Sequence, residues 1–190
     1  MSEQRKKHYP DGQLEQVSEF ENGFRNGVTK VYYEDGTIKE VLNYKNGILH
    51  GLGQWYYPNG RLKRETHFHN AKIVDTMKTY YPSGQVKEEW VFVEGQLNGR
   101  SRTYFESGVL KSEMNFIKDV KSGICETFDE NGTLREKGNY YNDNPHESTY
   151  IYDQAGKLIF EDCYEYGTRR VRKRYNEDGS VDEIDGTPGE

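Results

Sequence analysis

Hydrophobic and polar residues alternate along this chain in short stretches that are bounded by turn residues. Residues 62–68 read Leu-Lys-Arg-Glu-Thr-His-Phe, in which Leu62, Thr66 and Phe68 are interleaved with charged or polar side chains. A period of two is typical of a β-strand. The stretch follows Pro58-Asn59-Gly60, where proline presets φ for the first corner of a tight turn and glycine supplies a positive φ. The pattern therefore predicts a β-hairpin.

The same hairpin pattern recurs along the chain at a nearly constant period. Successive turn glycines are 24 residues apart, except for the last, which is 23 residues after its predecessor. A second turn falls inside each period, for example at Asn22-Gly23, Asn46-Gly47 and Glu94-Gly95. Each repeat is therefore expected to contribute two antiparallel strands. The turn glycines are Gly12, Gly36, Gly60, Gly84, Gly108, Gly132, Gly156 and Gly179.

Pairing across the hairpin turn predicts which side chains share a face of the sheet. A three-residue turn at residues 58–60 places Tyr56 opposite Leu62, and because 24 is even, even-numbered residues would share one face in every repeat. We predict that this face is buried. It would carry the rows Tyr32, Tyr56, Tyr80, Tyr104, Phe128 and Tyr152; Ile38, Leu62, Val86, Leu110, Leu134 and Leu158; and Phe20, Tyr44, Phe68, Phe92, Phe116, Tyr140 and Tyr164. The odd-numbered face would carry a charge lattice of Lys39, Lys63, Lys87, Lys111 and Arg135 beside Glu65, Glu89 and Glu113.

These features predict an all-β fold, an elongated single-layer antiparallel β-meander of about seven to eight hairpin repeats. We expect residues 1–185 to form this array as a single domain and residues 186–190 to form a flexible C-terminal tail. The open ends of such a sheet invite pairing with another chain. Basic clusters at residues 5–7 and 169–174 would discourage that pairing, and the second cluster could instead form an anion-binding patch.

Composition favours a thin sheet over a globule with a large core. Only 33% of the residues are hydrophobic, while 16 Tyr and 2 Trp can bury apolar rings and keep their polar atoms hydrogen-bonded. The balance of 26 basic and 32 acidic residues, a net charge of −6, disfavours binding to nucleic acid through phosphates. No apolar stretch approaches the length of a membrane span or follows the N-terminus as a secretion signal would. We therefore expect a cytoplasmic protein that binds neither nucleic acid nor membranes.

Candidate chemistry is sparse. Cys125 and Cys163 fall on strands roughly 14 Å apart, too far for a disulfide, so both should stay reduced. His67 and His69 form a His-x-His pair with no third ligand in their repeat, and the turn carboxylates supply too few oxygens for calcium. The turn glycines lie in hairpins and not in a phosphate-binding loop. We predict no enzyme, catalytic residue, metal or cofactor.

Two segments of the repeat carry a family resemblance. They are Tyr-Tyr-Pro-Asn-Gly-Arg-Leu-Lys at 56–63 and Asn-Gly-Ile-Leu-His-Gly-Leu-Gly-Gln-Trp-Tyr at 46–56. They resemble MORN repeats, specifically the MORN-variant repeats of the bacterial YwqK-type toxin–antitoxin system antitoxin family. The resemblance implies a bacterial cytoplasmic protein that neutralises a cognate toxin, of the kind encoded by an adjacent gene. At five positions where other repeats have glycine, the chain has a different residue, and we expect distorted turns there. These positions are Ala71, Asp75, Asp119, Asp143 and Glu147.

An aromatic row interrupts the charged pattern of the odd-numbered face. It stands three residues before the turn glycine, is absent from the C-terminal repeats, and is joined by one tryptophan. The rings either cover the backbone of their own turn or form a partner-binding surface, because exposed aromatic residues flanked by charge are typical of binding hot spots. The partner-binding candidates are Tyr9, Tyr33, Trp55, Tyr57, Tyr81 and Phe105.

Together these observations favour a non-enzymatic protein-binding module, an antitoxin or immunity protein that occludes its toxin. The alternative is a MORN-type structural or membrane-peripheral scaffold. A single-layer sheet leaves apolar area uncovered, which is also compatible with a homodimer.

Overall fold

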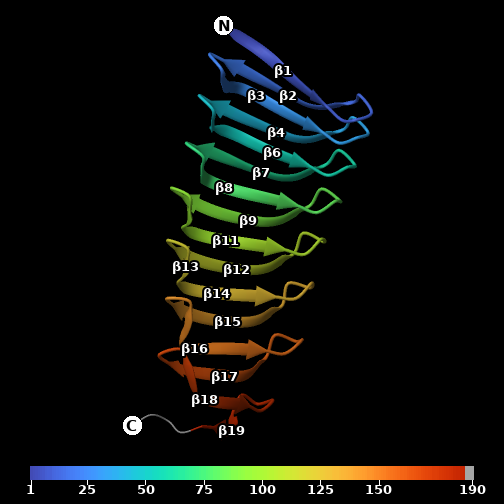
Figure 1. Ribbon diagram of the computed structural model, residues 1–190. Helices are drawn as coiled ribbons and strands as arrows, with labels where there is room; N and C mark the ends of the chain where they lie inside the picture. Colours follow the sequence, from blue (N-terminus) through green and yellow to red (C-terminus); the bar gives the residue numbers. More distant parts are fainter. Residues whose placement is uncertain (187–190) are drawn as a thin grey trace. The chain divides into compact units, whose positions relative to one another are not determined.

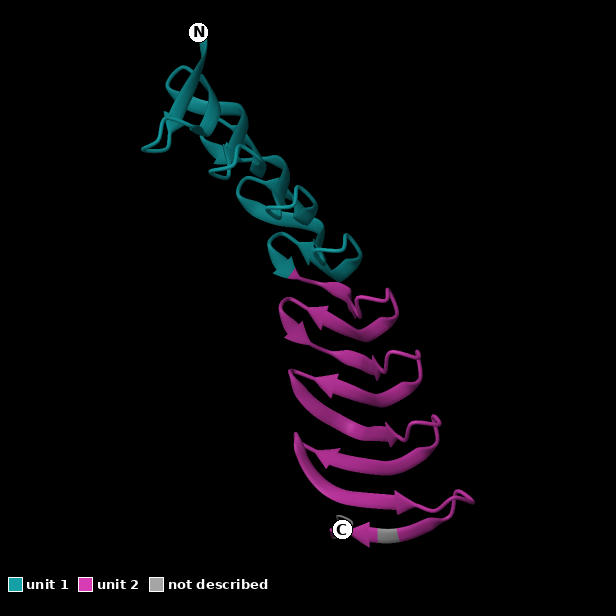
Figure 2. Ribbon diagram, turned by 90° about the vertical axis from the view of Figure 1, so that its right-hand side faces the viewer, with its two compact units in different colours: residues 1–96 teal, residues 97–190 magenta. Residues whose placement is uncertain are grey.

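The computed structural model describes residues 1–186, with residue 183 described by its backbone alone. The described residues contain strands and turns, and none of them belongs to a helix that is long and apolar enough to cross a membrane. The chain divides into two compact units, Met1–Gln96 and Leu97–Glu190 (Figure 2). Apart from Gly186, the tail predicted at residues 186–190 lies outside the described residues.

Unit 1 is an antiparallel meander in which successive long strands pair (Figure 1). Its strands are β1 (Ser2–His8), β2 (Leu14–Glu21), β3 (Phe24–Tyr32), β4 (Ile38–Lys45), β5 (Ile48–Leu49), β6 (Gly51–Tyr56), β7 (Leu62–His69), β8 (Lys72–Tyr80) and β9 (Val86–Val93). Strand β4 pairs with both the short β5 and the following β6. The two-residue β10 (Gln96–Leu97) lies where the two units divide.

Unit 2 repeats the same antiparallel order. Its strands are β11 (Gly99–Tyr104), β12 (Leu110–Ile117), β13 (Val120–Lys121), β14 (Gly123–Phe128), β15 (Leu134–Tyr141), β16 (Asn144–Tyr152), β17 (Leu158–Glu165), β18 (Thr168–Tyr175) and β19 (Val181–Asp185). The long strands of this unit are visibly bent along their length (Figure 2). The predicted all-β antiparallel meander of hairpin repeats is confirmed in both units.

The hairpin turns have the predicted geometry. The Tyr57 N–H donates to the Arg61 carbonyl at 2.8 Å, and the Gly60 N–H donates back to the Tyr57 carbonyl at 2.9 Å. Gly60 has a φ of 79°, which only glycine adopts without strain, and the other seven turn glycines also have positive φ. The periodic glycines are therefore explained by one turn that is used eight times.

The second turn of each repeat also keeps one conformation, so the expectation of distortion was wrong at Ala71, Asp119 and Asp143, whereas Asp75 (φ 65°) and Glu147 (φ 62°) lie outside this turn, in β8 and β16. Asn22 and Gly23 have φ values of 50° and 84°, as the two corners of a type I′ turn require. Ala71, Asp119 and Asp143 adopt φ values of 63°, 69° and 65° in place of glycine. The neighbouring repeat holds them there, because the N–H of each donates to a carbonyl 22 residues earlier.

A β-bulge after each hairpin turn changes which side chains share a face. Tyr56 pairs with Leu62 as predicted, but Trp55 pairs with Arg64, so one extra residue enters β7. Beyond the bulge, even-numbered residues of β7 lie beside odd-numbered residues of β6. Phe68 consequently lies with Trp55, their ring centroids 6.3 Å apart in an edge-on arrangement, and not with Tyr56 as predicted. We call this the Trp55 face and the opposite one the Tyr56 face.

The glutamates of the predicted charge lattice lie on the Tyr56 face. The Tyr80 hydroxyl donates to Glu65 at 2.6 Å, which places Glu65 with the tyrosines and not with Lys63 as predicted. Burial and this bond both raise the pKa of Tyr80. Opposite charges alternate along this row and form ion pairs in both units, namely Lys78–Glu89, Arg102–Glu113, Lys137–Glu126 and Lys173–Glu161.

Burial is concentrated along the centre of the Trp55 face, so the predicted buried face was also wrong. The least exposed side chains are small: Ser18 and Thr66 are each 1% exposed and Thr29 is 3% exposed. Rings of the same face cover these positions. A Cβ placed on Gly53 would lie 2.8 Å from Phe68 and 3.0 Å from Trp55. The bulge causes the error, because it reverses the alternation on which the prediction relied.

Candidate functional site

The predicted aromatic row connects successive repeats. The hydroxyls of Tyr9, Tyr33 and Tyr57 donate to the carbonyls of Tyr32, Tyr56 and Tyr80 at 2.6, 2.7 and 2.7 Å. Each bond therefore reaches into the following repeat and not into the turn that carries the ring. The rings, including Tyr81 and Phe105, are half-buried. The row thus has a structural role that neither interpretation of the sequence anticipated.

A row of lysines lies over these rings. The Lys ammonium groups are 5.4–5.9 Å from the ring centroids, within the range of cation–π attraction. The predicted lysine row is therefore part of the aromatic surface and not only a solvated lattice. The pairs are Lys39 with Tyr33, Lys63 with Tyr57, Lys87 with Tyr81 and Lys111 with Phe105.

Trp55 and Arg64 form the tightest aromatic contact of this surface in unit 1. Strand β6 ends just after Trp55, and the β7 bulge places Arg64 directly opposite it. The Arg64 guanidinium carbon lies 3.7 Å from the centre of the Trp55 ring, while the edge of Phe68 contacts the ring from the other side of Gly53. The guanidinium therefore makes a close cation–π contact with the indole.

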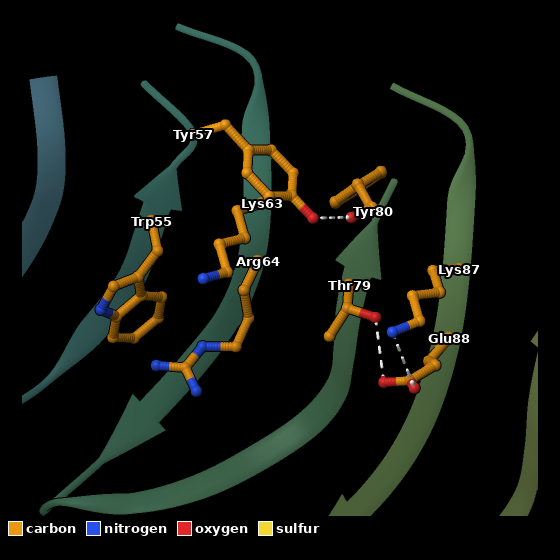
Figure 3. A pocket seen from close by; sticks show the side chains of 8 residues that line it. All are labelled: Trp55, Tyr57, Lys63, Arg64, Thr79, Tyr80, Lys87 and Glu88. Atoms are coloured by element: carbon orange, nitrogen blue, oxygen red, sulfur yellow. Dashed lines mark hydrogen bonds and ion pairs between the residues drawn. The ribbon is translucent and has the colours of Figure 1, made fainter. Parts of the chain in front are cut away.

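These two residues line a hollow of about 330 Å³ on the Trp55 face (Figure 3). The hollow brings together two of the predicted site residues, Trp55 and Tyr57. The other predicted residues, Tyr9, Tyr33, Tyr81 and Phe105, do not line it. Its remaining lining residues are Lys63, Arg64, Thr79, Tyr80, Lys87 and Glu88.

The charges around the hollow differ in how well they are paired. Glu88 accepts hydrogen bonds from the Thr79 hydroxyl at 3.0 Å and the Trp90 indole N–H at 3.3 Å. Arg64, by contrast, has a buried Nε with no hydrogen-bond partner among the described residues. Burial lowers the pKa of Arg64, and attraction to Glu40 only partly opposes this effect.

Arg64, Lys87 and Glu88 were not identified from the sequence. A signal was nevertheless present, because the residues at the Arg64 position of other repeats are Gln16, Glu40, Glu88, Ser112, Glu136 and Phe160, and those at the Trp55 position are Lys7, Val31, Thr79, Thr103, Thr127 and Ile151. The strands form in those repeats as well, so the fold requires neither the tryptophan nor the arginine.

The C-terminal repeats close the same turn without an aromatic ring. Asp129 accepts hydrogen bonds from the Asn131 and Thr133 N–H groups at 2.9 and 3.0 Å, and Asp153 makes the equivalent pair of bonds. The carboxylate therefore caps its own turn. The change from ring to carboxylate leaves the turn intact and removes the surface aromatic.

Other reactive side chains do not form a recognisable centre. Cys125 and Cys163 are free thiols as predicted, and burial raises the pKa of Cys125. The His69 ring lies 5.0 Å from that of His50, a neighbour that the sequence did not suggest. Within residues 1–186, no group of three His, Cys, Asp or Glu side chains is placed to hold a metal ion.

Comparison with known protein families matches the MORN repeat variant to residues 25–46, 49–70, 76–94, 97–118 and 121–142, more than half of the chain. No curated protein matches the chain. One matching solved structure is described as the crystal structure of TcdB2-TccC3-TEV. It is 14% identical with a TM-score of 0.24, and the match covers 95% of this chain but only 12% of that one.

Proposed function

Since the chain belongs to the MORN repeat variant family, which indicates a protein-binding or scaffold module, we propose that it is a non-enzymatic antitoxin or immunity protein. It acts in the bacterial cytoplasm, needs no cofactor, and neutralises a cognate toxin by occluding it. Its partner is a protein, and neither nucleic acid nor a membrane is part of its action. A homodimer is compatible with this role.

The observation that carries the proposal is the aromatic surface around Trp55 and Tyr57. Large rings and an arginine are the residues most enriched at the centres of protein interfaces. Trp55 and Arg64 also differ from the residues at the same positions of the neighbouring repeats, whose strands form without a tryptophan or an arginine there. The partner is therefore expected to contact this surface, with the other predicted residues of unit 1, Tyr9, Tyr33 and Tyr81, extending it, and Phe105 is the proposed contact in unit 2.

Overall charge supports occlusion of a basic partner. A net charge of −6 attracts a protein with a basic active cleft and speeds their encounter. A bound acidic sheet would then keep anionic substrates out of that cleft. Neutralisation in this scheme requires contact alone and no chemical step.

Co-expression in bacteria tests the proposal. The neighbouring reading frame is induced alone, with this protein, and with a Trp55→Ala, Tyr57→Ala double variant. Toxicity of the neighbour alone, rescue by the wild-type chain, and weaker rescue by a folded double variant are the expected results. A harmless neighbour, or one that kills equally in the presence of the wild-type chain, would refute the antitoxin role.

The alternative, a membrane-peripheral scaffold, has less support. The basic cluster at residues 169–174 would have to bind anionic lipid. Each of its charged side chains instead lies within 4 Å of a carboxylate: Arg169 of Asp162 and Asp185, Arg170 of Glu165, Arg172 of Asp162, Lys173 of Glu161, and Arg174 of Asp182. Sedimentation with anionic vesicles separates the two functions, because only the scaffold should sediment.

A further inference from the structure

The Arg64 guanidinium has a hydrogen-bonding edge that this chain does not use. Its central carbon lies 3.7 Å from the centre of the Trp55 ring, a contact that restricts the position of the group. A guanidinium donates its hydrogen bonds within its own plane, and a cation–π contact leaves them available. Among the described residues no hydrogen bond or ion pair to this group is formed, and its Nε is buried without a partner.

The two Nη groups of Arg64 also have no hydrogen-bond partner among the described residues and, unlike the Nε, are not buried, so they are the donors that a ligand in the hollow can reach. Glu40 is the nearest balancing charge, but it acts on Arg64 only by attraction at longer range. Glu88 lines the same hollow and is already engaged by Thr79, Trp90 and, at 3.9 Å, Lys87. Neither Glu40 nor Glu88 therefore accepts a hydrogen bond from the Arg64 guanidinium.

The rest of the hollow is also suited to an anion. The ammonium groups of Lys63 and Lys87 lie on the same side as Arg64, each near a tyrosine ring that restricts it (Figure 3). Three cations thus face one carboxylate that has other partners. This local excess of positive charge contrasts with the net charge of −6 of the whole chain.

We propose that the hollow binds the carboxylate of an Asp or Glu side chain exposed on the partner protein. Arg64 donates two parallel hydrogen bonds to the carboxylate oxygens from its Nη1 and Nη2 groups, because its Nε is buried from solvent. Lys63 and Lys87 add attraction, while Trp55 and Tyr57 contact the carbon atoms around the carboxylate. The inference rests on the proposed protein-binding function and specifies one residue class at the centre of the interface.

We take the occupant to be a carboxylate and not a phosphate, because the proposed partner is a protein and the ordinary anionic side chains of proteins are Asp and Glu. A hollow that binds a carboxylate also makes the proposed occlusion selective for particular partner proteins. Bulk acidity attracts any basic protein, whereas a cationic hollow accepts only those with an acidic side chain at the matching position.

The test is an NMR titration of the purified full chain with an N-acetylated, C-amidated hexaglutamate peptide. The reporters are the Nε–H of Arg64 and the indole N–H of Trp55. Both signals should shift and saturate together. Arg64→Gln should weaken peptide binding at least tenfold. Arg64→Lys keeps the positive charge but loses the planar pair of N–H donors, and it should weaken peptide binding by a smaller factor.

Lys72→Gln is the matched control. It removes the same charge in the same unit, from a side chain that is 60% exposed and does not line the hollow. Its effect should stay below twofold. If Arg64→Gln and Lys72→Gln weakened peptide binding equally, the binding would depend on overall charge alone and the proposal would be overturned. NMR signals of Arg64 and Trp55 that do not shift on addition of the peptide would also overturn it. Inorganic phosphate that shifts the reporters at lower concentration than the peptide would also overturn it.

The titration needs no toxin, so its result is independent of the co-expression assay. A failed titration with successful neutralisation would reject the carboxylate site and keep the antitoxin role. A saturating titration with no neutralisation would keep the carboxylate site and reject the antitoxin role.

Discussion

The Tyr57 hydroxyl donates a hydrogen bond of 2.7 Å to the carbonyl of Tyr80, which belongs to the next repeat. On the opposite edge of unit 1, the Gly47, Ala71 and Gly95 N–H groups donate to the carbonyls of Arg25, Leu49 and Ile73 at 2.7–2.9 Å. Successive repeats are therefore joined at both ends of their strands as well as by strand pairing. These edge bonds fix each hairpin relative to the next.

Removing one hydroxyl should weaken this connection measurably. We expect Tyr57→Phe to lower the free energy of unfolding by about 1 kcal/mol, because the Tyr80 carbonyl loses a donor while the ring and its contact with Lys63 remain. The complementary variant is Phe105→Tyr, which restores the hydroxyl of the other repeats and should raise stability by up to about 1 kcal/mol. Urea denaturation followed by circular dichroism checks both, and a loss on Phe105→Tyr would contradict the role assigned to the hydroxyl.

Ala71→Gly should stabilise the protein. Ala71 has a φ of 63°, a conformation that costs an L-residue about 1–2 kcal/mol, whereas glycine adopts it freely. Part of this gain is offset by the greater flexibility of glycine in the unfolded chain, so the expected increase is about 0.5–1 kcal/mol. The urea midpoint should rise accordingly.

Asp143→Gly provides the contrast to Ala71→Gly. Asp143 has nearly the same φ of 65°, but its carboxylate accepts a hydrogen bond of 2.8 Å from the Lys121 N–H. Aspartate also tolerates the left-handed region better than alanine does. Its replacement should therefore lower the urea midpoint. Stabilisation by both glycines would show that backbone strain alone governs these turns.

Asp162 should be among the most sensitive positions of unit 2. Its side chain is 3% exposed and accepts two hydrogen bonds of 2.6 Å from Arg172, the forked arrangement of a strong ion pair. We expect Asp162→Ala to cost about 3 kcal/mol, because the guanidinium keeps its charge and loses both acceptors. Asp182→Ala, which removes an exposed partner 3.9 Å from Arg174, should cost less than about 0.5 kcal/mol. Thermal unfolding of the two variants measures the difference.

Sequence periodicity predicted the strands and turns because both depend on local residue choices. The Gly60 turn and the pairing of Tyr56 with Leu62 follow from two or three neighbouring residues. The assignment of faces failed beyond the bulge, since one extra residue in β7 reverses the alternation and moves Phe68 to the other face. No residue type marks that insertion, because the bulge arises from the fit between turn and strand twist.

The candidate site was only partly predictable for a different reason. Trp55 and Tyr57 stood out as aromatic residues in a charged pattern, but Arg64 looks like one more charged residue of a strand. Its significance depends on the residue directly across from it, which the bulge determines. The left-handed conformation shared by Ala71 and Asp119 was missed likewise, because hydrogen bonds to the neighbouring repeat hold the turn: both backbone N–H groups donate to it, and the Asp119 carboxylate also accepts from the Leu97 N–H.

Acid should remove a contribution to stability that depends on Glu161. Its carboxylate accepts hydrogen bonds from the Tyr175 hydroxyl at 2.7 Å, the Ser148 hydroxyl at 2.9 Å and the Lys173 ammonium at 3.1 Å. Burial alone would raise the pKa of Glu161, but these bonds outweigh it and lower the pKa below the ordinary value. A carboxyl whose pKa is lower in the folded than in the unfolded chain stabilises the fold above its unfolded pKa, about 4.3 for glutamate, and loses that effect as pH falls through the folded pKa.

Glu161→Gln should therefore cost about 1–2 kcal/mol near pH 7, and the difference from wild type should shrink steadily once the pH drops below about 4.3. Urea unfolding of both chains between pH 3 and pH 7 measures this gap. Tyr175→Phe removes the shortest of the three hydrogen bonds, so the gap between Tyr175→Phe and the Tyr175→Phe, Glu161→Gln double variant should be smaller at pH 7. A gap that stays constant over the whole pH range would show that Glu161 acts through packing and not through its charge.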